Sequence, residues 1–301
     1  MKKIVRKFLS YFGYDFIKIT PKPFLKKEYE VRIGNYTLTM PSINPLIDVY
    51  RNKKDFASEI GRITLCVHEK YTQLRFIDVG ANTGDTAAII KSVINIPLIC
   101  IEGDPFSFSY LKRNVEQLSD VTIFNNYLGE KEDTLEIVEE KAGWNTTLIP
   151  SPKKGRKITL TTLDNLLYQN FKDLKNFKLL KIDTEGFDTI ILRGSENFIL
   201  NNKPVIYIEY NRDNMSAINE DGLLTLLHME QLGYNKILFF DDRGRYILST
   251  TLSNKELIND LHNYADGKNG LIYYYNICLF HKEDTDIAET LIQNESGRLS
   301  L

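Results

Sequence analysis

A glycine-containing loop follows a short apolar stretch in FIDVGANTGDTAAII, residues 76–90. Gly80 allows a sharp turn with positive φ, and Gly84 omits a side chain where a ligand would approach the backbone. Asn82 adds a polar side chain, and the first N–H groups of the following helix point into the same space. At the carboxyl end of a strand in an α/β sheet, this pattern predicts a site for a nucleotide-like ligand, with Asp78 just before the loop.

A second acidic position supports this interpretation. Glu102 ends the next apolar stretch, about 20 residues after Gly80, which is the spacing at which a carboxylate accepts both hydroxyls of a ribose. Asp104 is predicted to cap the next helix, with Pro105 as the first helical residue. Each feature alone is also typical of an ordinary turn or a solvated surface acid, but together they favour a ligand site.

The loop also indicates which kind of nucleotide could bind. It lacks the third glycine of G-x-G-x-x-G, the motif that brings a pyrophosphate onto a helix N-terminus. A cofactor without phosphates fits better, and S-adenosylmethionine has a ribose for Glu102 and an ammonium group that suits an acid such as Asp78. Two alternatives stay open, which are an NAD-dependent oxidoreductase and a non-catalytic S-adenosylmethionine-binding module. The missing third glycine disfavours the first of these.

Two further acids follow another apolar stretch, in the sequence LLKIDTEGFD. Asp183 and Glu185 are expected just beyond a strand on the ligand side of the sheet, where a carboxylate could orient an acceptor hydroxyl and take its proton. We assign this role to Asp183 first and to Glu185 second. The alternative is that these acids belong to the first turn of a helix capped by Thr184, with Asp188 near its positive end.

A divalent metal is a further option that is not expected here. Asp183, Glu209 and Asn211 could offer oxygen ligands to magnesium at two neighbouring strand ends, but hard cations need more ligands than these. The histidines and cysteines form no cluster with the spacing of a metal site, so no metal ligand is assigned.

Residues 130–160 show no clear periodicity, and long irregular segments in compact domains are typical of functional loops. We therefore predict a substrate loop there. Trp144 beside Asn145 suits a sugar ring, although it could equally cover the core. The basic stretch at 152–157 is typical of a solvated loop, unless the acceptor carries a phosphate.

The surrounding elements predict an α/β fold. Apolar strands alternate with helices, which is typical of a mostly parallel sheet with helices on both faces. The expected strands lie at 75–80, 98–103, 121–129, 177–183, 204–211 and 271–282. Residues 235–248 are expected to form a strand, a turn at Arg243-Gly244 and a further short strand. Before them, a hairpin at 29–41 turns at Gly34-Asn35 and a helical region covers 44–72. Residues 283–301 form a polar tail that is frayed or loosely helical.

The composition of the chain indicates which binding partners and which cellular compartment to expect. The chain is 43% hydrophobic and 26% charged, with a net charge of −2, so nothing indicates a nucleic-acid partner. Three widely spaced cysteines in apolar stretches predict buried free thiols in a reducing compartment. No apolar run approaches the ~20 residues of a membrane span, which favours a cytoplasmic protein. The N-terminal segment has basic and apolar residues at helical spacing, so it either packs on the domain or makes weak peripheral contact with a membrane. The oligomeric state stays open.

Several segments together resemble the FkbM-type family of S-adenosylmethionine-dependent methyltransferases. They are DVGANTG at 78–84, IEGDP at 101–105, TTLDNLL at 161–167, LLKIDTEGFDTIILRG at 179–194 and PVIYIEYN at 204–211. The similarity covers about residues 70–245. It implies a class I methyltransferase (Rossmann-like) fold with a seven-stranded sheet whose last strand is antiparallel, and O-methylation of a glycan or similar small-molecule hydroxyl.

The resemblance also implies roles for individual residues. Asp78, Gly80, Asn82 and Gly84 would line the methionine end of the cofactor, Glu102 would hold the ribose, and residues near Asn126 would border the adenine. Many family members have proline where this chain has Gly103, and histidine where it has Tyr210. We expect an N-terminal extension over 1–70, a methyltransferase domain over 71–282 and a C-terminal tail.

Overall fold

A computed structural model describes residues 27–53, 56–142, 145–150, 155–266 and 272–298. The predictions for the N-terminal segment, for Trp144 and for Lys153 and Lys154 fall outside these residues. Among the described residues, no helix is both long and apolar enough to cross a bilayer.

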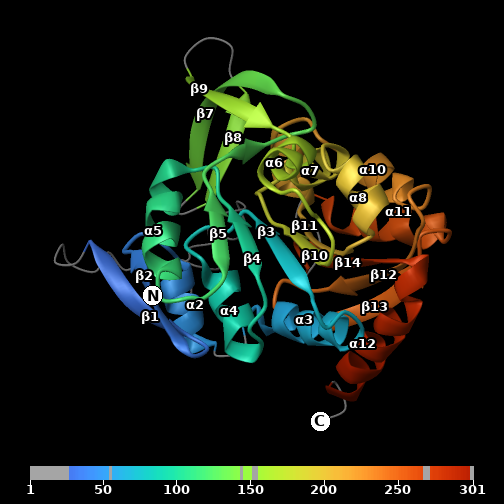
Figure 1. Ribbon diagram of the computed structural model, residues 1–301. Coiled ribbons are helices and arrows are strands. Elements are labelled where there is room, and N and C mark those ends of the chain that lie inside the picture. The colour runs from blue at the N-terminus through green and yellow to red at the C-terminus, as the bar shows by residue number, and fades with distance from the viewer. Residues whose placement is uncertain (1–26, 54–55, 143–144, 151–154, 267–271, 299–301) are drawn as a thin grey trace, which may run out of the picture.

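An eight-stranded sheet forms the centre of the molecule (Figure 1). In spatial order its strands are β13 (Tyr246–Thr251), β12 (Tyr234–Phe240), β14 (Tyr275–His281), β11 (Val205–Tyr210), β10 (Phe177–Ile182), β3 (Arg75–Val79), β4 (Leu98–Ile101) and β5 (Val121–Phe124). The last five of these are mutually parallel, and β14 runs antiparallel to both of its neighbours. The mostly parallel sheet is confirmed. The sheet has one strand more than the seven that the family resemblance implies. The additional strand is β13, the short strand predicted after the Arg243-Gly244 turn, which pairs antiparallel with β12 at the edge of the sheet.

Helices cover both faces of this sheet, and successive strand residues point to opposite sides. One face packs against α3 (Ser58–Lys70), α4 (Asp85–Val93) and α12 (Thr285–Arg298), through side chains such as Phe76 and Leu179. The other face, with Ile77 and Leu180, packs against a second set of helices. These are α6 (Leu163–Asn170), α7 (Asp188–Arg193), α8 (Glu196–Asn202), α9 (Arg212–Ala217), α10 (Leu223–His228) and α11 (Lys255–Tyr264). The three cysteines are buried and free, as predicted.

The predicted hairpin forms from β1 (Glu28–Ile33) and β2 (Tyr36–Pro41), and α2 (Leu46–Asn52) follows it. It docks on α4 and on α5 (Pro105–Val115). The Asn114 amide accepts from Thr39 N at 2.8 Å and donates to Thr39 O at 2.9 Å. Asp104 caps α5 by accepting from Ser107 N at 2.9 Å, so this helix begins as its sequence predicts.

The irregular segment predicted over 130–160 is instead a small four-stranded sheet, so that prediction was wrong. Its strands are, in spatial order, β6 (Tyr127–Leu128), β9 (Arg156–Thr161), β7 (Asp133–Ala142) and β8 (Asn145–Pro150). Ile137, Ile158 and Leu160 are its buried core. These apolar residues are few, so the period of two is weak in the sequence. The predicted strand at 121–129 is correspondingly divided between β5 and β6.

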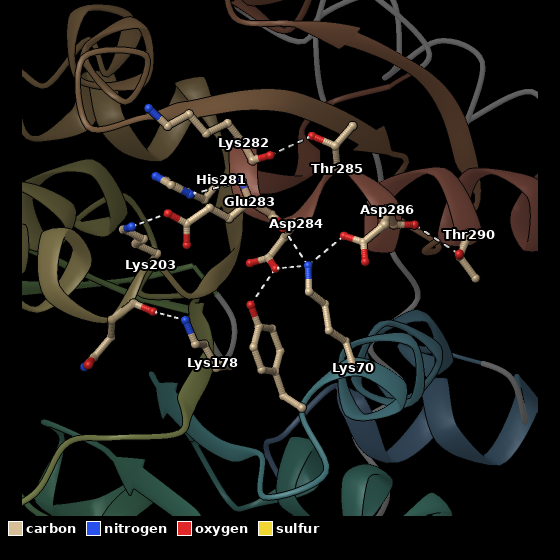
Figure 2. Close-up of polar contacts among 12 residues, drawn as sticks. Lys70, Lys178, Lys203, His281, Lys282, Glu283, Asp284, Thr285, Asp286 and Thr290 are labelled. Carbon is tan, nitrogen blue, oxygen red and sulfur yellow. Dashed lines mark hydrogen bonds and ion pairs between the residues drawn. The ribbon is translucent and has the colours of Figure 1, made fainter.

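The C-terminal tail is a packed helix. Ile287, Ala288 and Leu291 of α12 are buried against the sheet face that α3 also covers. Just before it, the fully buried Asp284 pairs with Lys70 Nζ at 2.9 Å and accepts from the Tyr71 hydroxyl at 2.6 Å. Lys70 also reaches Asp286, as Figure 2 shows. These contacts join the start of α12 to the end of α3. The tail was predicted to be frayed or loosely helical because its few apolar residues are spread through a mostly polar sequence.

Candidate active site

A cavity of about 820 Å³ opens at the carboxyl ends of the parallel strands. Its walls come from the segments after β3, β4, β10 and β11, from residues 43–46 and 56–60, and from the turn between β12 and β13. Seven predicted site residues line it, namely Gly80, Asn82, Glu102, Asp104, Asn126, Asp183 and Glu185. Parallel strands end at one edge of a sheet, so segments far apart in sequence meet there.

Gly80 lets the loop after β3 lie directly against the end of β10. Its φ is +79°, and a Cβ atom placed on it would lie 1.8 Å from the carbonyl oxygen of Asp183. Asp183 N donates to Val79 O at 3.0 Å. The glycine loop and the first predicted catalytic acid therefore form one closely packed unit.

Replacing Gly80 by alanine should force the loop after β3 away from the end of β10. We expect the free energy of unfolding to fall by at least about 2 kcal/mol, because the Cβ meets backbone and the left-handed φ is strained. Chemical denaturation measures the effect. Gly297→Ala is the matched control, since it lies on the exposed side of α12 with no atom within 4 Å of an added Cβ. Equal stability of the Gly80 variant and this control would contradict the close approach.

Glu102 holds the glycine loop and the start of α5 together. Its Oε2 accepts from Asn82 N and its Oε1 from Asp104 N, both at 2.8 Å. Burial raises the pKa of Glu102 to about 7, although both backbone donors favour the ionised form. Each carboxylate oxygen keeps a second lone pair that a ligand hydroxyl could use.

Asp78 and Gly84, two predicted ligand contacts, do not line the cavity. Asp78 is fully buried and pairs with Lys181 Nζ at 3.3 Å. Burial raises the pKa of Asp78 to about 6, against the attraction of Lys181. Gly84 has a φ of +92° at the start of α4, and a Cβ there would meet Leu111 of α5 at 3.1 Å. Asp78 therefore affects the site only indirectly, through its ion pair with Lys181. Gly84 affects it by allowing α4 and α5 to pack closely.

Lys181 is the principal residue that the sequence reasoning missed. It lines the cavity between two aspartates, 3.3 Å from Asp78 Oδ1 and 3.1 Å from Asp183 Oδ2. Parallel register places it beside Asp78 on β3 and Tyr207 on β11. Burial alone would lower the pKa of Lys181, but the neighbouring aspartates raise it above its ordinary value. The available signal was a lysine near the carboxyl end of the otherwise apolar strand FKLLKI, whose other lysine, Lys178, is near the opposite end.

The two candidate catalytic acids differ in their surroundings. The Asp183 side chain is 43% exposed and forms an ion pair with Lys181. Glu185 adopts a left-handed φ of 55°, and its Oε2 accepts from the Asn214 side chain at 2.6 Å. Asp183 therefore keeps a solvent-accessible carboxylate that an acceptor can reach.

The predicted helix cap at Thr184 is wrong. The helix begins only at Asp188, whose carboxylate accepts from Thr184 N and Gly186 N, both at 3.1 Å. A buried aspartate reaching back to free backbone N–H groups replaces the hydroxyl cap. Burial raises the pKa of Asp188 to about 8. Two short helices, α7 and α8, follow KIDTEG, because the chain turns at Gly194 and Ser195.

Glu209 lies next to Asp183, since Ile182 and Ile208 are paired in the parallel register and each acid follows its isoleucine. Glu209 Oε2 is buried and has no hydrogen-bond partner in the described part of the chain. Burial and then Asp183 raise the pKa of Glu209 well above its ordinary value. Asn211 caps α9 by accepting from Asn214 N. Within the described ranges, no group of three or more His, Cys, Asp or Glu side chains is placed to hold a metal.

The cavity also has a wall that contains Asn126, Tyr127 and Leu128. A Cβ on Gly103 would lie 2.3 Å from the Tyr127 ring, so the glycine lets this ring lie over the end of β4. The Tyr127 hydroxyl accepts from Arg156 Nη2 at 2.6 Å. The contact with Tyr127 explains why Gly103 suits this chain.

Tyr210, which with Gly103 is one of the two departures from the family pattern, does not line the cavity. Its hydroxyl is 2.8 Å from His262 Nδ1, and both side chains are buried. An imidazole from α11 therefore contacts the residue that stands where relatives often carry histidine.

The order of the strands, with one antiparallel strand inserted beside parallel ones, and the cavity at their carboxyl ends define a class I methyltransferase-like fold. Residues 78–236 match the sequence profile of the methyltransferase FkbM domain. The chain belongs to this family. No protein with a curated description matches the sequence.

Solved structures with similar folds include other methyltransferases. The FkbM methyltransferase from Methylobacillus flagellatus KT is 14% identical with a TM-score of 0.40, over 78% of this chain and 60% of that one. The plantazolicin methyltransferase BamL, in complex with a triazolic desmethylPZN analog and SAH, is 11% identical with a TM-score of 0.43, over 78% and 88%. TYW2 from M. jannaschii, in complex with AdoMet, is 10% identical with a TM-score of 0.44, over 88% and 92%. The present chain thus spans 60% of the length of the Methylobacillus protein.

Proposed function

We propose that this protein is an S-adenosylmethionine-dependent O-methyltransferase that methylates a hydroxyl of a saccharide or a similar hydroxylated metabolite. The observation that carries the proposal is that one cavity joins the Glu102 loop to Asp183. A ligand held by the first is thereby brought next to an accessible carboxylate. Family membership supports methyl transfer, and the family resemblance supports oxygen as the acceptor atom.

The residues present fit the cofactor. Asn82 Oδ1 is buried without a hydrogen-bond partner among the described residues, and it can accept from an ammonium group. Glu102 can offer its remaining lone pairs to ribose hydroxyls. Asn126, Tyr127 and Leu128 line the same cavity and are the proposed neighbours of the adenine. When bound, S-adenosylmethionine supplies an electrophilic methyl group on a sulfonium.

Asp183 is the proposed base. As the acceptor oxygen gains its bond to the methyl carbon it becomes cationic, and Asp183 takes the hydroxyl proton. Lys181 holds the aspartate through their ion pair, so that the carboxylate is aimed before the acceptor enters. Because methyl transfer is an in-line displacement, such alignment supplies much of the acceleration. Glu185, held by Asn214, is the second candidate for this role.

The first experiment separates this proposal from its rivals. Isothermal titration calorimetry should detect binding of S-adenosylmethionine and none of NAD. A radiolabelled methyl-transfer screen against glycans, glycolipids and nucleotide sugars, with and without chelator, should then label a hydroxyl. NAD binding without S-adenosylmethionine binding would favour an oxidoreductase, and cofactor binding with no transfer to any acceptor would favour a binding module.

The pH dependence of cofactor affinity gives a sharper test. Ribose hydroxyls donate to an ionised Glu102, whose pKa in the free protein is about 7. Cofactor affinity should therefore weaken as the pH falls from 8 to 6, by at most about tenfold per unit. Glu102→Gln should bind more weakly at every pH and lose this dependence, because its amide group faces an N–H donor. A wild-type Kd that does not change with pH would count against Glu102 as the ribose ligand.

The remaining predictions extend this proposal. We propose that residues 71–282 form the methyltransferase domain, that residues 1–70 extend it, and that the protein acts in the cytoplasm on a small-molecule or glycan acceptor. Weak peripheral membrane contact through the N-terminal segment belongs to the same proposal. Fluorescence localisation of the full chain and of a variant lacking residues 1–26 would test it.

A further inference from the structure

The half of the cavity away from Glu102 has a wall of its own. It is built from the first turn of α3, the ends of β10 and β11, the start of β14 and the turn between β12 and β13. The carboxyl-bearing residues on it are Glu59, Asp183, Glu185, Glu209 and Asp242, and the cations are Lys181 and Arg243. Lys181 is already held between two aspartates, and Arg243 is exposed at the turn.

Glu59 is the clearest sign of a missing ligand. It is 4% exposed, and its Oε1 accepts from the Tyr207 hydroxyl at 2.7 Å. Its Oε2 has no hydrogen-bond partner in the part of the chain that the structure describes. Arg62, a cation that lowers the pKa of Glu59, is engaged by Glu295 through Nε at 2.5 Å. Oε2 lies against Gly244 of the turn between β12 and β13, and both residues line the cavity. A buried acceptor without a donor is costly, so a ligand donor at this part of the wall would relieve that cost.

Glu209 repeats the pattern elsewhere on the same wall. Its Oε2 is likewise buried and without a hydrogen-bond partner among the described residues. Asp183 and Glu185 are its acidic neighbours, so three carboxyl groups meet around one part of the cavity. Burial raises the pKa of Glu59 and of Glu209, which is the response of carboxyls that lack a counter-ion.

We propose that this wall binds an acceptor that carries a protonated amine beside the hydroxyl to be methylated, as an amino sugar or an amino alcohol does. The inference rests on the proposed methyltransferase function and narrows its acceptor. An ammonium group supplies three donors and the missing positive charge, whereas a neutral diol supplies donors only and a carboxylate or phosphate is repelled. Asp183 then lies between the ammonium site and the reacting hydroxyl.

Three small probes of nearly equal size test the charge preference directly. Ethanolamine, ethylene glycol and glycolate are titrated into the full chain with S-adenosylhomocysteine bound, and binding is followed by ligand-observed NMR. We expect ethanolamine to bind roughly tenfold more tightly than ethylene glycol, as one charge-assisted hydrogen bond implies, and glycolate not to bind. Glu59→Gln and Glu209→Gln should each remove most of the ethanolamine preference. The amide introduced by Glu59→Gln can still accept from Tyr207, so that fold and cofactor binding should persist.

Glu256→Gln, on the exposed start of α11, is the matched control and should keep the preference. Equal binding of ethanolamine and ethylene glycol, or an unchanged preference in both pocket variants, would overturn the inference. Magnesium is titrated separately. If it binds, loses its binding in the same two variants and competes with ethanolamine, the site is a metal site and the proposal of an amine ligand is overturned. If S-adenosylhomocysteine itself fails to bind, the proposed function fails first, so the two failures are distinguishable.

Discussion

Replacing Asp183 by asparagine is expected to lower the rate of methyl transfer by about 100- to 10,000-fold, because the group that takes the hydroxyl proton is lost. The Kd for S-adenosylmethionine should change little, since the proposed cofactor ligands are Glu102 and Asn82, on the segments that follow β4 and β3. Single-turnover transfer and calorimetry on the same preparation measure the two quantities. Asparagine keeps the shape of the side chain and can still accept from Lys181.

Two comparisons make this result specific. Asp260→Asn, on the exposed side of α11, should leave both the rate and the Kd unchanged. Glu185→Gln should have the smaller effect of the two candidate acids, because Glu185 is already occupied by Asn214. If Asp183→Asn retains full activity while Glu185→Gln abolishes it, the assignment of the base is reversed.

Replacing Lys181 by methionine is expected to lower the free energy of unfolding by about 3–5 kcal/mol near pH 8, because it leaves Asp78 charged and unpaired inside the protein. Asp78 already has a raised pKa of about 6. A carboxyl raised in this way stabilises the fold most below its unfolded pKa of about 4, and this contribution is lost as the pH rises through 6. Without Lys181 the folded pKa rises further, so the damage should grow between pH 5 and pH 8.

Urea denaturation at these two pH values measures the effect. The double variant Asp78→Asn/Lys181→Met should be more stable at pH 8 than Lys181→Met alone, since it buries no unpaired charge. Lys172→Met, at an exposed position, should match the wild type. Additive effects of Asp78→Asn and Lys181→Met would show that the pair is not coupled.

Much of the framework was accessible from sequence because it depends on local patterns. Apolar stretches bounded by turn residues predicted the strands, and Asp104-Pro105 predicted the start of α5. Glu102 and Gly80 were found because the spacing of a strand, a loop and a helix constrains where both must lie. In each case the signal is contained in a short segment or in the distance between two adjacent elements.

The rest depends on contacts that no short segment contains. Lys181 owes its position to the register of three strands, and Glu59 reaches the cavity from a helix that precedes the family domain. The small sheet was missed because its thin core needs few apolar residues. Asp188 accepts from a backbone N–H four residues earlier. The sequence pattern did not indicate this contact, because Thr184 is a more common type of capping residue.

Helix α3 connects two parts of the molecule that were described separately. Glu59 is in its first turn on the acceptor wall, and Lys70 is its last residue, paired with Asp284 before α12. The helix is about 20 Å long, since it has 13 residues that each rise about 1.5 Å. If this wall binds the acceptor as proposed, loosening the far end of α3 is expected to move Glu59 along the helix axis. The expected consequence is a higher KM for the acceptor, through a contact that lies at the opposite end of the helix from the cavity.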